Sequence, residues 1–130
     1  MMRILCVNDS PLTLGHLKRM LKKIAPDAEV FGCREAERAV SLASSEGCDV
    51  LVTEIDLAGS RREGLDLARK IKEINPKVNI IFATVYSEQE YADEILGLRI
   101  SGYITKPFDQ KKLADEFTNL RNPVEIHAEA

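Results

Sequence analysis

The sequence contains few cysteines and few aromatic residues, and these shortages exclude several classes of protein. Among its 130 residues there are three cysteines, no Trp, and an aromatic fraction of 5%. Three cysteines without a CxxC pair argue against a disulfide framework or a zinc site, and we expect free thiols that pack in the core. So few aromatics leave little material for a platform on which bases or sugars could stack. Function is therefore to be sought in polar residues at fixed positions.

The sequence also lacks an excess of one charge and any long apolar run. Its 18 Lys and Arg nearly balance 21 Asp and Glu, for a net charge of −3, so a basic surface for nucleic acid or an anionic membrane is not expected. No apolar stretch approaches the roughly 18 residues that span a bilayer, and the N-terminus lacks the features of a signal peptide. We therefore predict a cytoplasmic protein without direct contacts to nucleic acid or membrane.

Short apolar segments alternate with amphipathic segments along the chain, which is typical of an α/β fold. Strands are expected at 4–7, 29–31, 50–54, 78–84 and 102–105. Between and after them, Ser10, Ser87 and Asp109 are expected to cap helices, while Pro26 and Pro76 end them. Since the strands are apolar throughout, both faces of the sheet should be covered. We predict a doubly wound parallel sheet with helices on both faces.

The length fits one domain with a single core. We assign residues 1–121 to that domain, and the apolar positions of its last three helices include Ile74, Leu96 and Leu120. Residues 122–130 have no apolar stripe of their own. We interpret them as a polar C-terminal tail or the start of a linker.

Polar side chains follow four of the predicted strands. Their positions are Asn8 and Asp9, then Glu54 and Asp56, then Thr84, then Lys106. In a doubly wound sheet the carboxyl ends of the strands meet in one crevice, where such folds bind their ligands. We therefore expect these side chains to converge on one site, although each alone has an ordinary role as a turn, cap, strand or surface residue.

The chemistry of this predicted site points to phosphoryl groups. Two carboxylates about 4 Å apart repel by roughly 4 kcal/mol at an effective dielectric of 20, so Asp9, Glu54 and Asp56 need a cation nearby. Lys106 supplies one positive charge, and Mg²⁺, which prefers oxygen ligands, could supply the rest. Thr84 adds a hydroxyl that can donate to an anionic oxygen. No glycine-rich loop is present to cradle a nucleotide, so bound ATP is not the expected phosphoryl donor.

The order and spacing of several motifs are specific when taken together. They are Val7-Asn8-Asp9 after the first strand, an acid at the end of the third, Gly64-Leu65 opening the third helix, Thr84, and Gly102-Tyr103-Ile104-Thr105-Lys106-Pro107-Phe108. From about residue 3 to residue 120 the chain resembles the receiver domain of two-component response regulators. The resemblance implies a flavodoxin-like (βα)5 fold whose five strands lie in the order 2-1-3-4-5.

The resemblance further implies a phosphorelay. A sensor histidine kinase or phosphotransfer protein would pass a phosphoryl group to an aspartate. Mg²⁺ would be held by an acid pair, by the acceptor and by the backbone carbonyl two residues after it. The corresponding residues here are Asn8 and Asp9 for the pair, Glu54 for the acceptor and Asp56 for the carbonyl.

Three more positions match family features. Thr84 and Lys106 match the phosphate-contacting hydroxyl and lysine, and Tyr103 matches the switch aromatic, although packing alone would also explain that tyrosine. The resemblance also implies a cis peptide bond before Pro107, whereas most X-Pro bonds are trans. Arg99 stands where the family usually has a glycine that ends a helix, which leaves the local turn open.

Two departures from the family lie at the site itself. Glu54 occupies the place of the acceptor aspartate and reaches about 1 to 1.5 Å farther from the strand, so it could approach Thr84 and Lys106 and partly imitate the phosphorylated state. Counting back from Gly64 instead makes Asp56 the acceptor. We prefer Glu54, because the loop before Gly64 can absorb a short insertion. Asn8 replaces an acid, which removes a charge from the metal site and should weaken Mg²⁺ binding.

We predict a receiver module of a two-component system that switches a protein-interaction surface, either by phosphorylation or as a pseudo-receiver. Its expected partners are the kinase or phosphotransfer protein, a downstream effector, and a second copy bound through the fourth helix, fifth strand and fifth helix. The main alternative is a small metal-dependent α/β phosphate-ester hydrolase. A flavodoxin-like cofactor binder is disfavoured because the loop after the first strand lacks a phosphate-wrapping Ser/Thr/Gly run.

Overall fold

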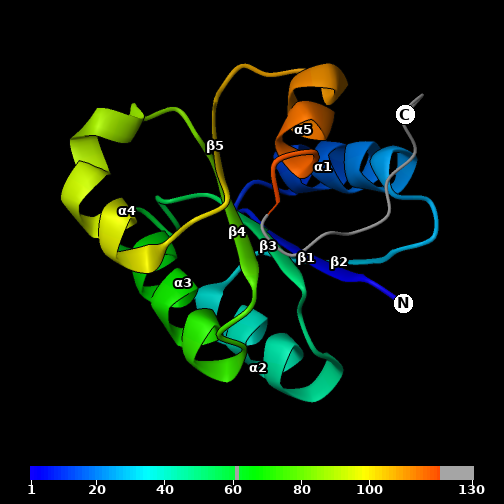
Figure 1. Ribbon diagram of the computed structural model, residues 1–130, viewed down its shortest axis with the longest axis horizontal. Coiled ribbons are helices and arrows are strands. Elements are labelled where there is room, and N and C mark those ends of the chain that lie inside the picture. The colour runs from blue at the N-terminus through cyan, green and yellow to red at the C-terminus, as the bar shows by residue number, and fades with distance from the viewer. Residues whose placement is uncertain (61, 121–130) are drawn as a thin grey trace.

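The fold is a five-stranded parallel sheet between two layers of helices (Figure 1). The computed structural model describes residues 1–60 and 62–120. In chain order the elements are β1 (Arg3–Val7), α1 (Pro11–Ile24), β2 (Glu29–Cys33), α2 (Ala36–Glu46), β3 (Val50–Thr53), α3 (Glu63–Ile74), β4 (Asn79–Thr84), η1 (Glu88–Tyr91), α4 (Ala92–Leu98), β5 (Gly102–Thr105) and α5 (Gln110–Phe117). The strand order is β2-β1-β3-β4-β5. The predicted fold class and order are confirmed.

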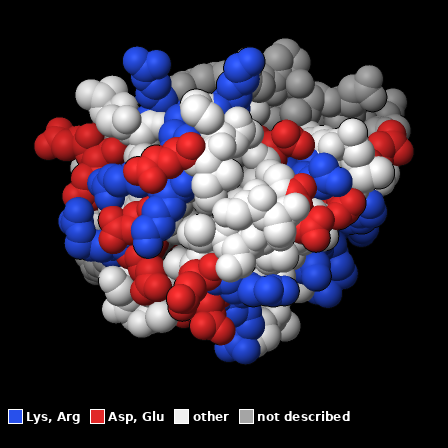
Figure 2. All heavy atoms as spheres, turned by 90° about the horizontal axis from the view of Figure 1, so that it is seen from below, with Lys and Arg blue, Asp and Glu red and all other residues white. Residues whose placement is uncertain are grey.

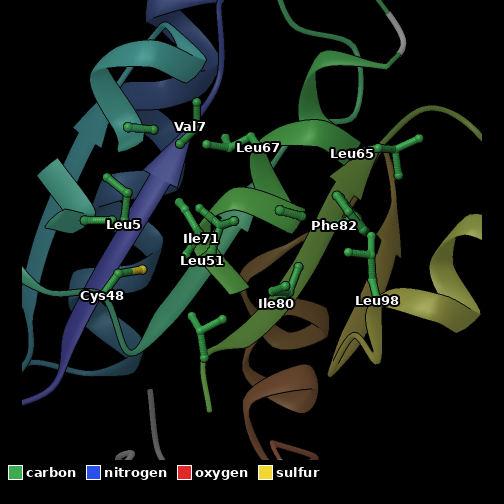
Figure 3. Packing of buried hydrophobic residues seen from close by; sticks show 14 of the residues in the cluster. Leu5, Val7, Cys48, Leu51, Leu65, Leu67, Ile71, Ile80, Phe82 and Leu98 are labelled. Atoms are coloured by element: carbon green, nitrogen blue, oxygen red, sulfur yellow. The ribbon is translucent and has the colours of Figure 1, made fainter. Parts of the chain in front are cut away.

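Alternation along the strands builds a separate core on each face of the sheet. Leu5 and Val7 of β1 pack with α2, α3 and α4, whereas Ile4 and Cys6 of the same strand pack with α1 and α5. Figure 3 shows the first of these cores, in which Leu51 and Phe82 lie under α3 and α4. Every residue of β3 and β4 is buried. Helices therefore cover both faces of the sheet, and the pairing of the strands sets the positions of their ends relative to one another.

Several local expectations are confirmed. The Ser10 Oγ accepts a hydrogen bond from the backbone N–H of Thr13, and the Asp109 side chain accepts one from Lys112, so both residues cap their helices. Arg99 ends α4 in the left-handed conformation, with φ of 54°. An arginine can therefore take the turn in which the family usually has glycine.

Other expectations are wrong in detail. β3 ends at Thr53 and β4 begins at Asn79, so each strand is one residue shorter than predicted. Ser87 makes no side-chain cap, and the 3₁₀ turn η1 precedes α4. Leu96 is 80% exposed and Ile74 is 42% exposed, because each helix packs only its narrow inner face against the sheet. The predicted tail, residues 122–130, lies outside the described residues.

Positive and negative side chains are mixed on the face of the molecule seen from below. There, Lys and Arg lie beside Asp and Glu around an uncharged strip (Figure 2). None of the helices in the described part of the chain has the length and apolar character needed to cross a bilayer.

The cysteines are free and buried, as the sequence predicts. Burial raises the pKa of the Cys6 thiol to about 12 and that of Cys48 to about 12, and it also raises the pKa of Cys33. Because the thiolate is the reactive form, only roughly one thiol in ten thousand would be ionised at pH 8 for Cys6 and Cys48.

We therefore expect iodoacetamide to label the native protein slowly at pH 8 and to label all three thiols within minutes once urea unfolds it. The measurement is intact mass against time, with and without denaturant. Rapid native labelling of Cys6 or Cys48 would contradict the packing described here.

Candidate functional site

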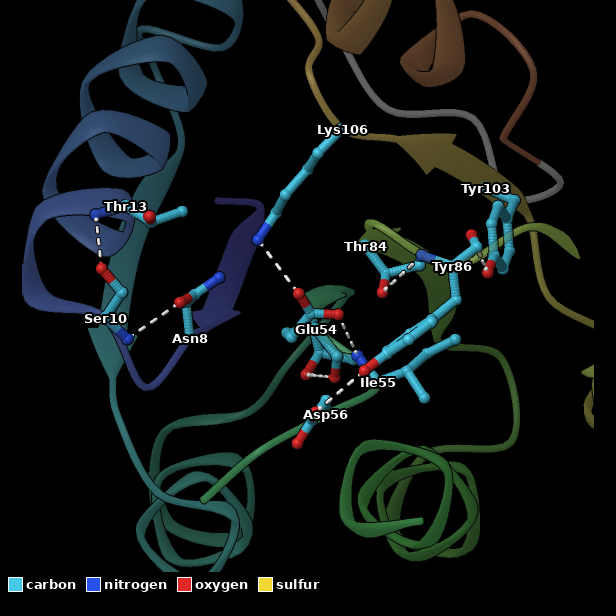
Figure 4. Close-up of polar contacts among 11 residues, drawn as sticks. Asn8, Ser10, Thr13, Glu54, Ile55, Asp56, Thr84, Tyr86, Tyr103 and Lys106 are labelled. Carbon is cyan, nitrogen blue, oxygen red and sulfur yellow. Dashed lines mark hydrogen bonds and ion pairs between the residues drawn. The ribbon is translucent and has the colours of Figure 1, made fainter. Parts of the chain in front are cut away.

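Five of the polar residues predicted from the sequence lie around one point at the carboxyl edge of the sheet: Asn8, Glu54, Asp56, Thr84 and Lys106 (Figure 4). Val7 of β1 pairs with Thr53 of β3, Thr53 with Phe82 of β4, and Thr84 with Thr105 of β5. These registers place the carboxyl ends of the four strands along one edge of the sheet. The residues that end or follow the strands therefore share one crevice. Asn8, Glu54 and Thr84 are all buried there.

Glu54 forms an ion pair with Lys106 at the centre of the crevice. The Lys106 Nζ donates to Glu54 Oε1 at 3.0 Å, and the backbone N–H of Ile55 donates to Oε2 at 2.7 Å. The Glu54 side chain is 9% exposed and the Lys106 side chain 22% exposed. Both carboxylate oxygens therefore accept a hydrogen bond. The longer side chain of glutamate brings its carboxylate into contact with Lys106, as predicted.

The side chain of Asn8 binds the backbone just before helix α1. Its Oδ1 accepts a hydrogen bond from the backbone N–H of Ser10 at 2.9 Å, which forms an Asx turn ahead of the Ser10 cap. The amide is thereby oriented with its Nδ2 buried and without a hydrogen-bond partner among the described residues. The position where the family has a carboxylate thus presents an N–H donor.

Asp9 lies apart from this buried group. Its side chain is exposed, and its backbone carbonyl accepts a hydrogen bond from Arg34 Nε at 3.1 Å. Asp9 therefore lies at the rim of the crevice, while Asn8, the residue before it, points inward.

Asp56 faces a residue that the sequence motifs do not indicate. The hydroxyl of Tyr86 donates to Asp56 Oδ2 at 3.1 Å, and Asp56 Oδ1 is buried with no partner in the described ranges. The available signal in the sequence is an aromatic two positions after Thr84, which a motif match does not record. Asp56 thus lies toward β4 and Tyr86, whereas Glu54 lies toward β5 and Lys106.

Thr84 and Tyr103 both bind the segment that follows β4. The backbone N–H of Tyr86 donates to Thr84 Oγ1 at 3.4 Å, and the Tyr103 hydroxyl donates to the carbonyl of Tyr86 at 2.8 Å. No hydrogen bond joins Thr84 to Glu54 in the part of the chain that is described, so the predicted approach of Glu54 to Thr84 does not become a bond. The Tyr103 ring packs on Phe82 with centroids 6.2 Å apart.

The Tyr103 phenol remains a hydrogen-bond donor over a wide pH range. Burial raises its pKa well above the usual value, and the negative charge of Glu54 raises it further. The Lys106–Pro107 bond is cis, as the resemblance implies.

The magnesium that the resemblance implies does not fit the side chains as they stand. Within the described ranges, no three His, Cys, Asp or Glu residues gather closely enough to hold a metal ion. Asn8 turns its oxygen to Ser10 and its N–H into the crevice, and both oxygens of Glu54 are occupied. A donor N–H repels a cation, so the side chains of Asn8, Asp9 and Glu54 as placed do not offer a magnesium ion a shared set of oxygen ligands.

Two curated proteins are similar in sequence to most of this chain. Sensory transduction protein LytT of Bacillus subtilis is 30% identical over 113 residues, which is 87% of this chain and 45% of that protein. LytR of Staphylococcus saprophyticus is 32% identical over 113 residues, 87% of this chain and 43% of that protein. The chain thus spans less than half the length of these curated relatives.

Solved structures share the fold. A receiver domain protein of Clostridium thermocellum has a TM-score of 0.79 at 22% identity and covers 94% of this chain and 95% of its own. A CheY-like receiver domain protein of Methanospirillum hungatei has a TM-score of 0.79 at 24% identity, covering 91% of each chain. The sequence itself matches the family described as response regulator receiver domain over residues 4–118. The chain belongs to the receiver domains of two-component response regulators.

Proposed function

We propose that this receiver domain signals without being phosphorylated, and that Glu54 bound to Lys106 holds it in one state. The observation that carries the proposal is the pair of bonds on Glu54, from Lys106 Nζ at 3.0 Å and from the Ile55 N–H at 2.7 Å. A carboxylate with both oxygens engaged is not free to attack phosphorus in line, and small misplacements reduce such rates strongly.

The electrostatics of the crevice support the same proposal. A phosphoryl donor is an anion, and it would approach the carboxylates of Asp9, Glu54 and Asp56, while Lys106 is already paired with Glu54. The family relies on a metal to offset this repulsion, yet Asn8 offers an N–H instead of a carboxylate. No step of the proposed mechanism therefore runs through magnesium.

The output is a binding event at a surface. Receiver domains of this family interact with histidine kinases and with effectors. We infer that the face formed by α4, β5 and α5, here called the output face, binds a downstream effector or a second copy of the chain in the cytoplasm. Tyr103, which carries the switch position, lies on β5 in this face. A kinase or phosphotransfer protein would then dock without transferring its phosphoryl group.

The test is phosphorylation in solution, followed by intact mass. With Mg²⁺ and acetyl phosphate, we expect no stable gain of a phosphoryl group by the natural sequence. The double variant Asn8→Asp with Glu54→Asp restores the acid pair and the shorter acceptor, so it should bind Mg²⁺ and gain one phosphoryl group. Glu54→Asp alone is the matched control and should gain less, because the metal site still lacks a charge.

Three results would overturn the proposal. A phosphoryl gain by the natural sequence that Asp56→Asn abolishes would make Asp56 the acceptor. A gain abolished by Glu54→Gln would make Glu54 a working acceptor. Repeated turnover of a phosphate ester would instead favour the small hydrolase.

A further inference from the structure

Polar contacts tie the ends of β3, β4 and β5 into a closed ring. On one side, Lys106 binds Glu54 at 3.0 Å. Two residues along the chain from Glu54, Asp56 accepts from the Tyr86 hydroxyl at 3.1 Å, and the Tyr86 carbonyl accepts from the Tyr103 hydroxyl at 2.8 Å. Tyr103, the second residue of β5, and Lys106, the first residue after it, are three positions apart, so the backbone of β5 closes the ring (Figure 4).

Tyr86 makes two of the contacts in this ring, one through its side chain and one through its backbone. Its hydroxyl faces Asp56 while its carbonyl faces Tyr103. Its ring also packs edge-to-face against Tyr91, with centroids 6.0 Å apart and planes at 72°. The bond to Asp56 and the bond to Tyr103 therefore act on the same residue, and a shift of the Tyr86 backbone on loss of the Asp56 contact would displace the carbonyl that binds Tyr103.

A second contact joins the β3–α3 loop to helix α4. Arg62, just before α3, pairs with Glu94 of α4 at 3.3 Å. This pair is more exposed and so is weaker than the bond to Asp56. The Asp56–Tyr86 bond connects the β3–α3 loop to the segment after β4, and the Arg62–Glu94 pair connects the same loop to α4 itself.

We propose that the Asp56–Tyr86 hydrogen bond is a latch that holds Tyr103 inward and thereby fixes the arrangement of the output face. The inference rests on the proposed function only in taking that face as the output. A hydrogen bond from a phenol to a carboxylate is charge-assisted and stronger than a neutral one. It links the acidic end of the crevice to the β4–α4 segment without a phosphoryl group.

A simpler explanation makes the opposite prediction. If packing on Phe82 alone held Tyr103, removing the Tyr86 hydroxyl would leave Tyr103 unmoved, because the Tyr86 ring would still be present. The two explanations can therefore be separated by changing single oxygen atoms.

The chain contains three tyrosines, so 3-fluorotyrosine labelling gives three fluorine resonances, each assignable by its loss in a Tyr→Phe variant. Tyr86→Phe keeps the ring and removes the hydroxyl, and we expect the Tyr103 resonance to shift or broaden by more than its natural linewidth. Tyr91→Phe is the matched control, since the Tyr91 hydroxyl has no hydrogen-bond partner among the described residues. It should leave Tyr103 unchanged.

A second pair of variants tests the same bond from the other side and covers a failure of Tyr86→Phe to fold. Asp56→Ala removes the acceptor and should move the Tyr103 resonance as Tyr86→Phe does, with no added effect in the double variant. Asp56→Asn keeps an amide oxygen that can accept from the phenol, so Tyr103 should stay close to its natural position. Far-ultraviolet circular dichroism confirms folding in each case.

The latch is overturned if Tyr103 stays in place in Tyr86→Phe or in Asp56→Ala, or if Tyr91→Phe moves it equally. These outcomes are independent of the phosphorylation test. A phosphoryl gain by the natural sequence would overturn the proposed function and leave the latch standing, whereas an unmoved Tyr103 would do the reverse.

Discussion

Replacing Lys106 with Met should lower the free energy of unfolding by about 2–4 kcal/mol, because it leaves the Glu54 charge in the crevice without its cation. Glu54 is 9% exposed at the side chain, so water cannot replace the lost partner fully. Lys106 is 22% exposed, which lets some solvent enter, and the Ile55 N–H still binds Glu54. These compensations place the expected loss toward the lower end of values for fully buried pairs. Urea unfolding at neutral pH measures it.

The matched control removes both charges. Glu54→Gln alone should also destabilise the protein, but the double variant Glu54→Gln with Lys106→Met should recover much of the loss, because no unpaired charge remains. The double-mutant cycle then gives a coupling free energy of about 1–3 kcal/mol between the two side chains. Additive effects, with coupling near zero, would show that the ion pair does not hold this site together.

The elements and the location of the site are predictable from the sequence for a simple reason. Parallel strands buried on both faces need apolar residues throughout, as in Ile4–Val7, and their carboxyl ends must lie together in a doubly wound sheet. The contact between Glu54 and Lys106 follows from the same placement, because the longer side chain reaches the lysine that ends β5. These predictions need only the pattern of apolar residues along the chain and the general rule that the carboxyl ends of parallel strands lie at one edge of the sheet.

The contacts that the sequence does not indicate depend on the paths of loops. Tyr86 contacts Asp56 because the segment after β4 lies against the β3–α3 loop. The spacing of residues in the sequence does not predict that path. Likewise, Asn8 resembles a metal-site residue in the sequence, yet its oxygen is taken by the Ser10 N–H. The direction of a short polar side chain at a strand end is decided by which backbone N–H lies nearest, and the sequence alone does not specify it.

Gly64→Ala is expected to destabilise the domain more than alanine at any other glycine, because only there would the added Cβ overlap backbone atoms. Gly64 lies in the first turn of α3, and its N–H donates to the carbonyl of Ile55 at 2.9 Å. A Cβ at this position would overlap the Glu54 carbonyl oxygen and the Ile55 backbone. Backbone atoms cannot rotate away as a side chain can, so α3 or the Glu54–Ile55 segment must shift. The expected loss is about 3 kcal/mol or more.

Gly97→Ala is the matched control, because it adds the same methyl group inside another helix. A Cβ at Gly97 of α4 meets nothing within 4 Å, so only the higher helix propensity of alanine operates, and stability should rise by about 0.5–1 kcal/mol. Opposite signs for the two variants in urea unfolding would separate the steric contact from propensity. A neutral Gly64→Ala would show that α3 does not press on the Glu54 carbonyl.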